Sequence, residues 1–236
     1  IMKKTINMFV LLCAALALCP GLKAQSVVAL HGAGGQSYFS GNNSFTDAIN
    51  AANPGDTIYL PGGNFPAPSF IDKQLYIMGA GHHPEYTAAT MPSIVSGNLL
   101  LKAGTNGSHF EGILFQNSIS IESNAGVHNL SMKRCHFVRT LYYQSSNTTT
   151  SDNNQYTECI FSQGINADGA RFLMLSNSIF YDSGSTIANL KNGTLMNSIV
   201  LANSALLYGP INSTFVNNIF KGGHLNYFSA GPSYYS

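Results

Sequence analysis

The chain is poor in charged residues and contains no tryptophan. Only 9% of its 236 residues are Asp, Glu, Lys or Arg, which is too few for a long helical bundle with Glu- and Lys-rich exposed faces. It also lacks the basic patch that nucleic-acid binding requires, so we expect no nucleic-acid partner. Solubility must therefore come from Asn, Ser, Thr and Gly. An uncharged polar surface suits stacked strands, where like charges on neighbouring strands would repel.

Cysteines are also few. Of the four, Cys13 and Cys19 lie in the N-terminal apolar region, which leaves Cys135 and Cys159. No Cys-x-x-Cys motif and no Cys/His cluster with metal spacing occurs, so we expect no metal site. The two remaining cysteines either pair in an oxidising compartment or stack as small buried residues, and the second interpretation is favoured.

Long apolar runs are missing too. The run Met8 to Leu18 has 11 residues, follows two lysines and precedes a Pro-Gly break. This layout predicts a secretory signal peptide over residues 1–24, cleaved after Ala24, rather than a buried N-terminal helix, and the run is too short to span a bilayer. We expect an exported chain, secreted or at the cell surface, with one domain over residues 25–236 and no integral membrane span in the mature form.

What the sequence does contain is a repeat. Three tetrapeptides beginning at Asn177, Asn197 and Asn217 follow one another at intervals of 20 residues. A fixed period near 20 indicates one structural unit stacked on copies of itself. One column of the repeat consists of Phe115, Phe137, Phe161, Phe180, Val200 and Phe220. Short strands separated by Gly, Asn and Ser predict an all-β fold, a single-stranded right-handed parallel β-helix of about nine rungs.

The repeating asparagines have a structural explanation. Asn tolerates the left-handed backbone conformation, so it can form a tight bend between two strands. Stacked on itself, its amide can also form a ladder of hydrogen bonds. Arg134 and Glu158 occupy the same column in earlier rungs, and opposite charges about 4.8 Å apart predict an ion pair.

An amphipathic helix is predicted over residues 44–52. Ser44 is its expected N-cap, and Phe45, Ala48 and Ile49 lie on one face. This helix is well placed to cap the open N-terminal end of the stack, which would otherwise be an aggregation-prone edge. No matching cap is evident at the other end, so we expect that the last aromatic segment folds over it, or that the native protein continues or associates through the C-terminal end.

The segment after this helix resembles a known family. Pro54-Gly55-Asp56-Thr57-Ile58-Tyr59-Leu60-Pro61-Gly62-Gly63, followed by Leu75-Tyr76-Ile77-Met78-Gly79, resembles the N-terminal module of secreted right-handed β-helix proteins of the pectate-lyase-like superfamily. The continuation through His82 and His83 is similar to exported β-helix proteins common in Bacteroidota. The resemblance implies the fold and export. It implies no single activity, because the superfamily contains lyases, hydrolases, esterases and adhesins.

The residues expected of such enzymes are largely missing. Lyases of this fold need a basic residue to abstract a proton, and often calcium held by clustered acids. Here the acids are scattered, and none follows Asp182. The paired Asp and Gly-His-Gly segment of polygalacturonase-type hydrolases are absent, as is a Gly-x-Ser-x-Gly motif. We expect no cofactor, and calcium only if the chain is a lyase.

The remaining candidates lie in or near loops of the middle rungs. The catalytic candidates are Asp152, Asp168, Arg171 and Asp182, and the substrate-binding candidates are Arg139, Tyr142 and Tyr143. The acids are more often turn formers than ligands, and His136 is interpreted as a partly buried core substitution. The favoured function is therefore an exported, non-catalytic scaffold with a surface, adhesive or glycan-contacting role. The alternative is a polysaccharide lyase or glycoside hydrolase acting on an acidic polysaccharide. A tailspike-like trimer is disfavoured by the signal peptide.

Overall fold

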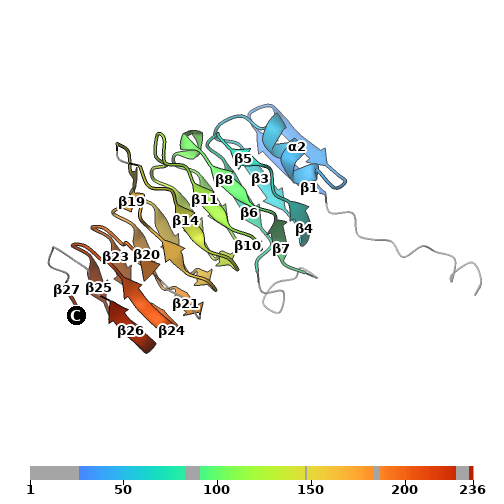
Figure 1. Cartoon of the computed structure of the whole chain (residues 1–236). Coiled ribbons are helices and arrows are strands. Elements are labelled where there is room, and N and C mark those ends of the chain that lie inside the picture. The colour runs from blue at the N-terminus through green and yellow to red at the C-terminus, as the bar shows by residue number, and fades with distance from the viewer. Residues whose placement is uncertain (1–26, 83–90, 147, 183–186, 227–233, 236) are drawn as a thin grey trace, which may run out of the picture.

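The computed structural model describes residues 27–82, 91–146, 148–182, 187–226 and 234–235. The predicted signal peptide lies outside these residues and stays a prediction. Figure 1 shows an elongated stack of strands that runs turn by turn from the blue N-terminal module to the red C-terminal strands. No helix in the described ranges is long and apolar enough to cross a membrane.

The N-terminal module is a hairpin covered by one helix. Strands β1 (Val28–Gly32) and β2 (Gly35–Phe39) pair antiparallel, and β1 also pairs antiparallel with β3 (Thr57–Leu60). The predicted helix is α2 (Ser44–Ala51), and it lies at the blue N-terminal end of the stack in Figure 1. Its N-cap is Asn43 rather than Ser44, whose side chain is buried. The hairpin was not predicted from the sequence.

One long sheet runs along one side of the molecule, with 11 strands in the order β2-β1-β3-β6-β9-β12-β16-β20-β23-β25-β27. From β3 onward its strands are parallel, as a stack of successive turns requires. We call it sheet A. Its remaining strands are β6 (Tyr76–Gly79), β9 (His109–Glu111), β12 (Ser131–Lys133), β16 (Gln155–Thr157), β20 (Met174–Ser176), β23 (Thr194–Met196), β25 (Thr214–Val216) and β27 (Tyr234–Tyr235).

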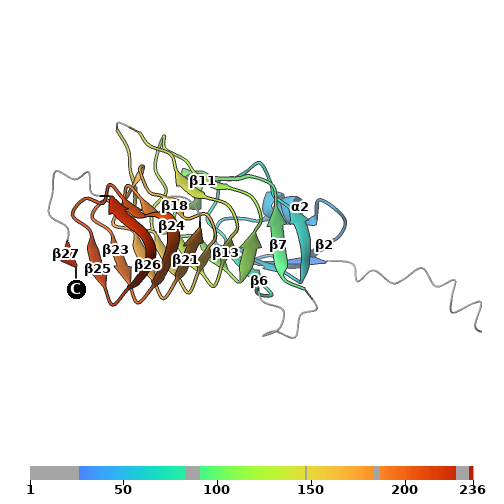
Figure 2. The same cartoon turned by 60° about the horizontal axis from the view of Figure 1, so that its bottom comes forward.

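A second sheet of 14 strands, sheet B, forms the other two sides. One side contains β4 (Gly63–Pro66), β7 (Ser93–Ser96), β10 (Ile113–Phe115), β13 (His136–Phe137), β17 (Ile160–Phe161), β21 (Ile179–Asp182), β24 (Ile199–Tyr208) and β26 (Ile219–Asn226). The other contains β5 (Phe70–Ile71), β8 (Leu99–Leu101), β11 (Ile119–Ile121), β14 (Leu141–Tyr143), β18 (Ile165–Asn166) and β22 (Ile187–Ala188). Figure 2 shows several strands of the first side next to one another. A short helix η2 (Ala103–Thr105) and the pair β15 (Ser151–Asp152) with β19 (Ala170–Arg171) complete the fold.

This architecture confirms the predicted all-β parallel β-helix and is consistent with a right-handed one. It has about seven turns rather than the predicted nine. The count is lower because the repeat is incomplete at both ends. The hairpin β1–β2 lies antiparallel beside the first turn, and β27 is the last described strand of its turn.

The interior is built from the predicted aromatic column. Phe115, Phe137, Phe161 and Phe180 are buried and stack in sequence, with ring centroids 5.5, 4.8 and 4.5 Å apart and planes within 14° of parallel. Each ring removes a large apolar surface from water and adds a stacking contact to its neighbour in the next turn. The core is therefore one continuous column along the axis of the stack.

The bend column is also confirmed. Asn177, Asn197 and Asn217 have φ of 50 to 52°, and Arg134 and Glu158 share this left-handed conformation. The hydrogen-bond ladder of the described residues lies one position later than the predicted ladder of asparagine amides, and in it backbone N–H groups donate to side-chain oxygens. The Ser178 N–H donates to Ser198 Oγ at 3.1 Å, and the Ser198 N–H donates to Asn218 Oδ1 at 2.9 Å. Cys135 and Cys159 occupy earlier positions of this inner column, where both are buried free thiols.

The predicted ion pair between Arg134 and Glu158 is wrong. The Arg134 guanidinium pairs with Glu111, one turn earlier, and Glu158 pairs with Lys133 Nζ at 3.8 Å. Both bend residues hold their side chains on the outer surface, so each reaches the outward residues at the end of the neighbouring strand.

Candidate functional site

The four predicted catalytic residues do not form one site. Asp152 and Arg171 are register partners in the small β15–β19 pair. Asp168 lies in the turn that precedes β19. Asp182 ends β21 in sheet B, where its backbone pairs with Ala202. Its side chain is not among those described. Only the first three residues therefore belong to one region of the surface.

Asp168 is held in an ion pair. Its Oδ1 lies 3.0 Å from Lys191 Nζ, which also donates to the Asp168 backbone carbonyl oxygen at 2.9 Å. The hydrogen bond from Lys191 lowers the pKa of Asp168, against a smaller opposing effect of burial. A carboxylate stabilised in its charged form is a poor general acid, because such an acid needs a raised pKa.

Asp152 has a less complete environment. Its N–H donates to His128 Nδ1 at 3.2 Å. Its Oδ1 is buried and has no hydrogen-bond partner among the described residues. The adjacent Arg171 is exposed and forms no ion pair with a described residue. This pair is the part of the predicted site that the structure brings together.

The predicted sugar contacts separate into surface and core. Arg139 and Tyr142 are exposed, with Arg139 in the turn before β14 and Tyr142 on the outside of that strand. Tyr143 is fully buried, and its hydroxyl lies 2.6 Å from that of Tyr156. Burial raises the pKa of both hydroxyls. Tyr143 is therefore a core residue, and its prediction as a substrate contact is wrong, because successive strand residues point to opposite faces.

His136 also differs from its interpretation as a core substitution. It is partly exposed on the outer face of sheet B, in register with Ile160. Its Nε2 lies 2.8 Å from Ser162 Oγ, and its ring meets that of His82 edge-on at 5.9 Å. The later members of the same column, Ile179, Ile199 and Ile219, are all exposed. This column therefore lies outside the core.

The outer face of sheet A carries a set of side chains that the sequence did not single out. Tyr38 and Tyr59 are both register partners of Ala29, and Tyr76 is the register partner of Thr57 on the same face. Their exposed fractions are 66, 50 and 40%. We call these three residues the tyrosine strip. Because Ala29 is small, the rings of Tyr38 and Tyr59 stand on either side of a low part of the surface above strand β1.

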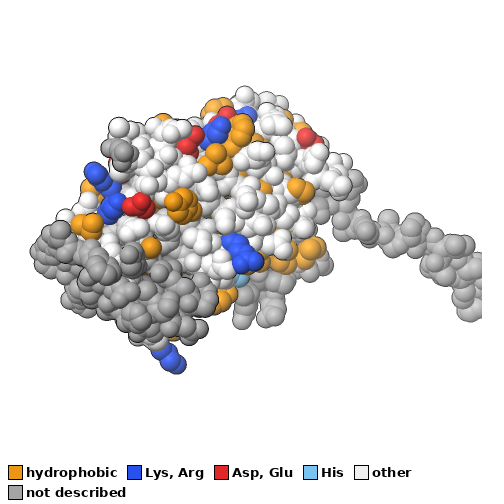
Figure 3. All heavy atoms as spheres, viewed as in Figure 1, with side chains coloured by type: hydrophobic (Ala, Val, Ile, Leu, Met, Phe, Trp, Pro, Cys, Tyr) orange, Lys and Arg blue, Asp and Glu red, His pale blue; other side chains and the backbone are white. Residues whose placement is uncertain are grey.

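A group of ionisable and hydroxyl side chains follows the tyrosine strip on the next turns. We call it the polar cluster, and it consists of His109, Glu111, Ser131, Lys133, Arg134 and Glu158. His109 is the register partner of both Tyr76 and Ser131, which places it directly between the strip and the rest of the cluster. Figure 3 shows how sparse charged side chains are on the face in view.

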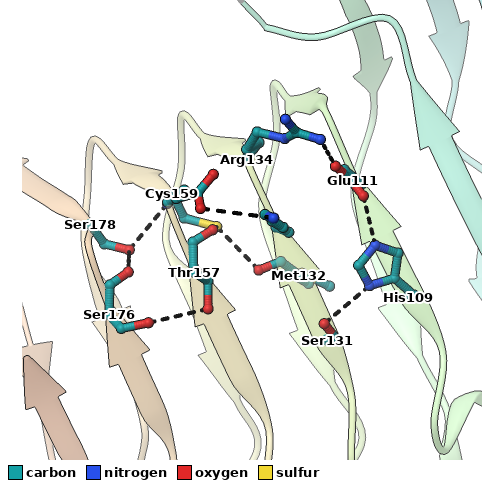
Figure 4. A network of polar contacts seen from close by, with 11 residues as sticks. His109, Glu111, Ser131, Met132, Arg134, Thr157, Cys159, Ser176 and Ser178 are labelled. Carbon is teal, nitrogen blue, oxygen red and sulfur yellow. Dashed lines mark hydrogen bonds and ion pairs between the residues drawn. The ribbon is translucent and has the colours of Figure 1, made fainter.

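The polar cluster is connected by short contacts, several of which appear in Figure 4. His109 Nδ1 lies 3.1 Å from Ser131 Oγ, and its Nε2 lies 3.0 Å from Glu111 Oε2. The second carboxylate oxygen, Glu111 Oε1, pairs with Arg134. His109 and Glu111 keep 24 and 14% of their side chains exposed. The cluster is therefore accessible at its surface but held in place by its neighbours.

The protonation state of His109 follows from its surroundings. Burial is the largest cause that lowers its pKa, followed by the positive charges of Lys133 and Arg134. The ring is therefore neutral near pH 7. Because the carboxylate of Glu111 can only accept, His109 Nε2 carries the proton and donates it, and Nδ1 accepts from the Ser131 hydroxyl. The described residues contain no group of three or more His, Cys, Asp or Glu placed to hold a metal ion.

Little in the amino-acid sequence points to the functional residues of this face. Inward residues repeat every turn because each packs on its copy, whereas outward residues need no such match. His109, Glu111 and Ser131 come from two turns and share no period. Alternation in strands β9 and β12 was the one available signal, since it places His109 and Glu111 on the face opposite Phe110.

No protein-family model matches this chain, and no curated protein matches it. Among solved structures, the catalytic domain of a GH87 alpha-1,3-glucanase in complex with nigerose is similar, with a TM-score of 0.46 and 18% identity. The alignment covers 75% of this chain and 36% of that one. Two variants of that domain, also with nigerose, match to the same degree. The chain thus spans about a third of the solved domain, and the likeness concerns the fold alone.

Proposed function

We propose that the chain is an exported β-helix scaffold that binds a polysaccharide on the outer face of sheet A and does not cleave glycosidic bonds. The observation that carries this proposal is the tyrosine strip: three exposed aromatic rings on one sheet face, within four consecutive strands of sheet A. An aromatic ring offers a flat apolar surface with a polar edge. Pyranose rings have matching apolar faces and polar rims, so they can stack there.

The rigid backbone supports this role. The strands of sheet A are spaced about 4.8 Å apart, and Tyr38 and Tyr59 are separated by one intervening strand. The two rings therefore stand about 10 Å apart, twice the strand spacing. Binding groups that are already ordered lose little conformational entropy when a ligand arrives. An extended glycan laid across the strands would contact the strip and then the polar cluster.

The charges of the polar cluster favour a neutral glycan. Lys133 and Arg134 are balanced by Glu111 and Glu158, to which they are paired. A polyuronide would need unpaired cations along its path. The balanced cluster instead offers hydrogen-bond donors and acceptors for sugar hydroxyls.

The alternative, a lyase or hydrolase on an acidic polysaccharide, has less support. Hydrolysis of a glycoside normally uses two opposed carboxyl groups, one of which must be protonated. Glu111, Glu158 and Asp168 each lie beside a cation. The observation in favour of an enzyme is Asp152 with its buried, unpartnered oxygen beside Arg171.

The test is affinity electrophoresis of the purified chain through gels that contain neutral or acidic polysaccharides. We expect retardation by a neutral glycan that is lost in the double variant Tyr59→Ala/Tyr76→Ala. The matched control is Met174→Ala, a similarly exposed side chain farther along the same face. Retardation that survives the double variant, or product release that Asp152→Asn or Arg171→Ala abolishes, would contradict the proposal.

Export remains part of the proposal. A chain secreted from its native host and sequenced from its N-terminus should begin at Gln25. A mature protein that still carries residues 1–24 would contradict it.

A further inference from the structure

We propose that Ser131 is an activated nucleophile for acyl transfer, with His109 as its general base and Glu111 as a positioning residue, and that its substrates are O-acyl esters on glycans. Only the last part, that the ester is carried by a glycan, rests on the proposed function. The reactivity of Ser131 itself stands independently on the geometry of the polar cluster.

Three functional groups lie in a hydrogen-bonded chain. Ser131 Oγ lies 3.1 Å from His109 Nδ1, and His109 Nε2 lies 3.0 Å from Glu111 Oε2. A hydroxyl within hydrogen-bond reach of a base, which a third group orients in turn, is the arrangement of nucleophilic catalysis. Such an arrangement is recognised by the geometry and the roles of its three groups rather than by their order in the sequence. Here the ring is turned so that Nδ1, rather than Nε2, faces the hydroxyl.

The backbone holds this chain of groups rigidly. His109 and Ser131 are register partners in parallel strands, and Glu111 follows His109 by two residues on the same face. Arg134 holds the other oxygen of Glu111, so the carboxylate is held in its orientation toward His109. Groups on strands of a stacked sheet are positioned more precisely than groups on loops.

The protonation states fit the roles. The lowered pKa of His109 keeps its ring neutral at pH 7, so that Nδ1 has a lone pair for the Ser131 proton. The adjacent carboxylate then stabilises the imidazolium that forms during the reaction. Both requirements hold without any change in the arrangement of the side chains.

Donors for the developing oxyanion lie next to Ser131. Gln155 is the next register partner of Ser131, and its exposed side-chain amide bonds to no described residue. Lys133 lies two residues after Ser131 on the same face. An amide N–H and an ammonium group can both stabilise negative charge on the carbonyl oxygen of a bound ester.

The reaction balances with water as the second reactant. Ser131 Oγ attacks the ester carbonyl carbon while its proton passes to His109 Nδ1. The tetrahedral intermediate expels the sugar oxygen, which takes the proton from Nδ1, and the acyl group stays on Ser131. A water molecule then attacks the acyl carbon and gives its proton to Nδ1. Collapse returns that proton to Ser131 Oγ and releases the carboxylic acid.

A purely structural role for these hydrogen bonds makes a different prediction. Polar pairs across strands stabilise a sheet whether or not a hydroxyl is reactive. Such pairs would leave Ser131 as inert as any other surface serine. Chemical reactivity, rather than stability, therefore separates the two accounts.

The experiment treats the folded chain with a fluorophosphonate probe and maps the modified residue by peptide mass spectrometry. Hydrolysis of 4-nitrophenyl acetate is measured in parallel. We expect Ser131 as the labelled residue. Loss of the general base in His109→Ala should reduce both rates about 10²–10⁴-fold, and Ser131→Ala should abolish labelling. The matched control is Thr194→Ala, a hydroxyl removed from the same face, which should change neither rate.

The pH profile distinguishes positioning from mere folding. The rate should rise with pH through the lowered pKa of His109 and level off above it. In Glu111→Gln, loss of the negative charge should move this rise to lower pH and reduce kcat with little change in KM. Circular dichroism should show the same fold for all variants.

Labelling that is absent in the folded chain, or that persists in Ser131→Ala, would overturn the proposal. Labelled Ser131 without acetate release from an acetylated neutral glycan would overturn the substrate class alone. Failure of glycan binding in the electrophoresis test, with labelling intact, would overturn the proposed function and leave the nucleophile standing.

Discussion

The outer face of sheet A has one backbone but two kinds of chemistry. From β2 to β12 it presents the tyrosine strip followed by the polar cluster. From β20 to β25 the same face presents Met174, Thr194, Met196 and Val216, with no ionisable group on those strands. From β3 onward both halves belong to one continuous series of parallel strands. The contrast teaches that repetition builds this molecule, and that function is best sought where the repetition of side chains is broken.

The interior shows no such division. The stacked phenylalanines continue from Phe115 through Phe180, across the change in outer chemistry. The fold therefore does not require tyrosine or histidine on one half of the outer face and methionine or threonine on the other. Those outer differences are free to serve a ligand.

The largest expected effect is on stability, and it tests whether the stacked phenylalanines hold both halves of the molecule together. Phe161→Ala removes a ring that lies between two others at 4.8 and 4.5 Å. We expect a loss of about 3–5 kcal/mol in the free energy of unfolding, because a cavity forms in a rigid core. Urea denaturation measures it, with Thr194→Ala as a surface control. A loss below that of the control would mean that the column does not hold the two halves together.

The next effect tests the left-handed bend that follows strand β23, in the half of the face without ionisable groups. Asn197 has a φ of 50°, and Asn197→Ala should cost about 1–2 kcal/mol because alanine resists the left-handed conformation. Asn197→Gly should be close to neutral, since glycine adopts it freely. Chemical denaturation of the two variants compares them. Equal losses for Ala and Gly would contradict a backbone cause and indicate a role for the amide.

A smaller effect is expected from adding an aromatic side chain to the half of the face without ionisable groups. Met174 lies two strands beyond Ser131 in the same row, past the part of the face that the glycan contacts in the wild type, and Met174→Tyr adds an aromatic ring there. We expect tighter binding by about 0.5–1 kcal/mol, comparable with one additional aromatic contact. Affinity electrophoresis against the wild type detects this gain. Unchanged or weaker retardation would indicate that the glycan does not continue in this direction.

The smallest effect concerns an ion pair outside the compared face. Asp168→Asn removes the partner of Lys191 and should cost about 0.2–1 kcal/mol, as exposed pairs do. Since the folded pKa of Asp168 is lowered, this stability is present above about pH 3.9, the usual Asp pKa, and is lost as pH falls through the lowered value. Thermal denaturation of both proteins at pH 7 and pH 2 should show a difference only at pH 7. A difference that persists at pH 2 would contradict the electrostatic cause.

The parts predictable from the sequence were those that packing repeats. The phenylalanine column and the left-handed asparagines recur because each turn contacts a copy of itself. The polar cluster could not be found this way, because Arg134 and Glu158 pair with outward residues of different strands rather than with each other. Tyr143 was misplaced since strand alternation, rather than its neighbour Tyr142, decides which face it occupies. The hairpin β1–β2 was missed because it lies outside the repeat.

The most direct test of the central claim is hydroxyl-radical footprinting of the folded chain with and without the retained polysaccharide. Tyrosine and methionine side chains are both oxidised, and Met174, at 38% exposed, is matched to Tyr76 at 40%. The account predicts that the ligand protects Tyr38, Tyr59 and Tyr76 and leaves Met174 unchanged. Protection of Met174 or of Tyr142, with the tyrosine strip still fully oxidised, would contradict it.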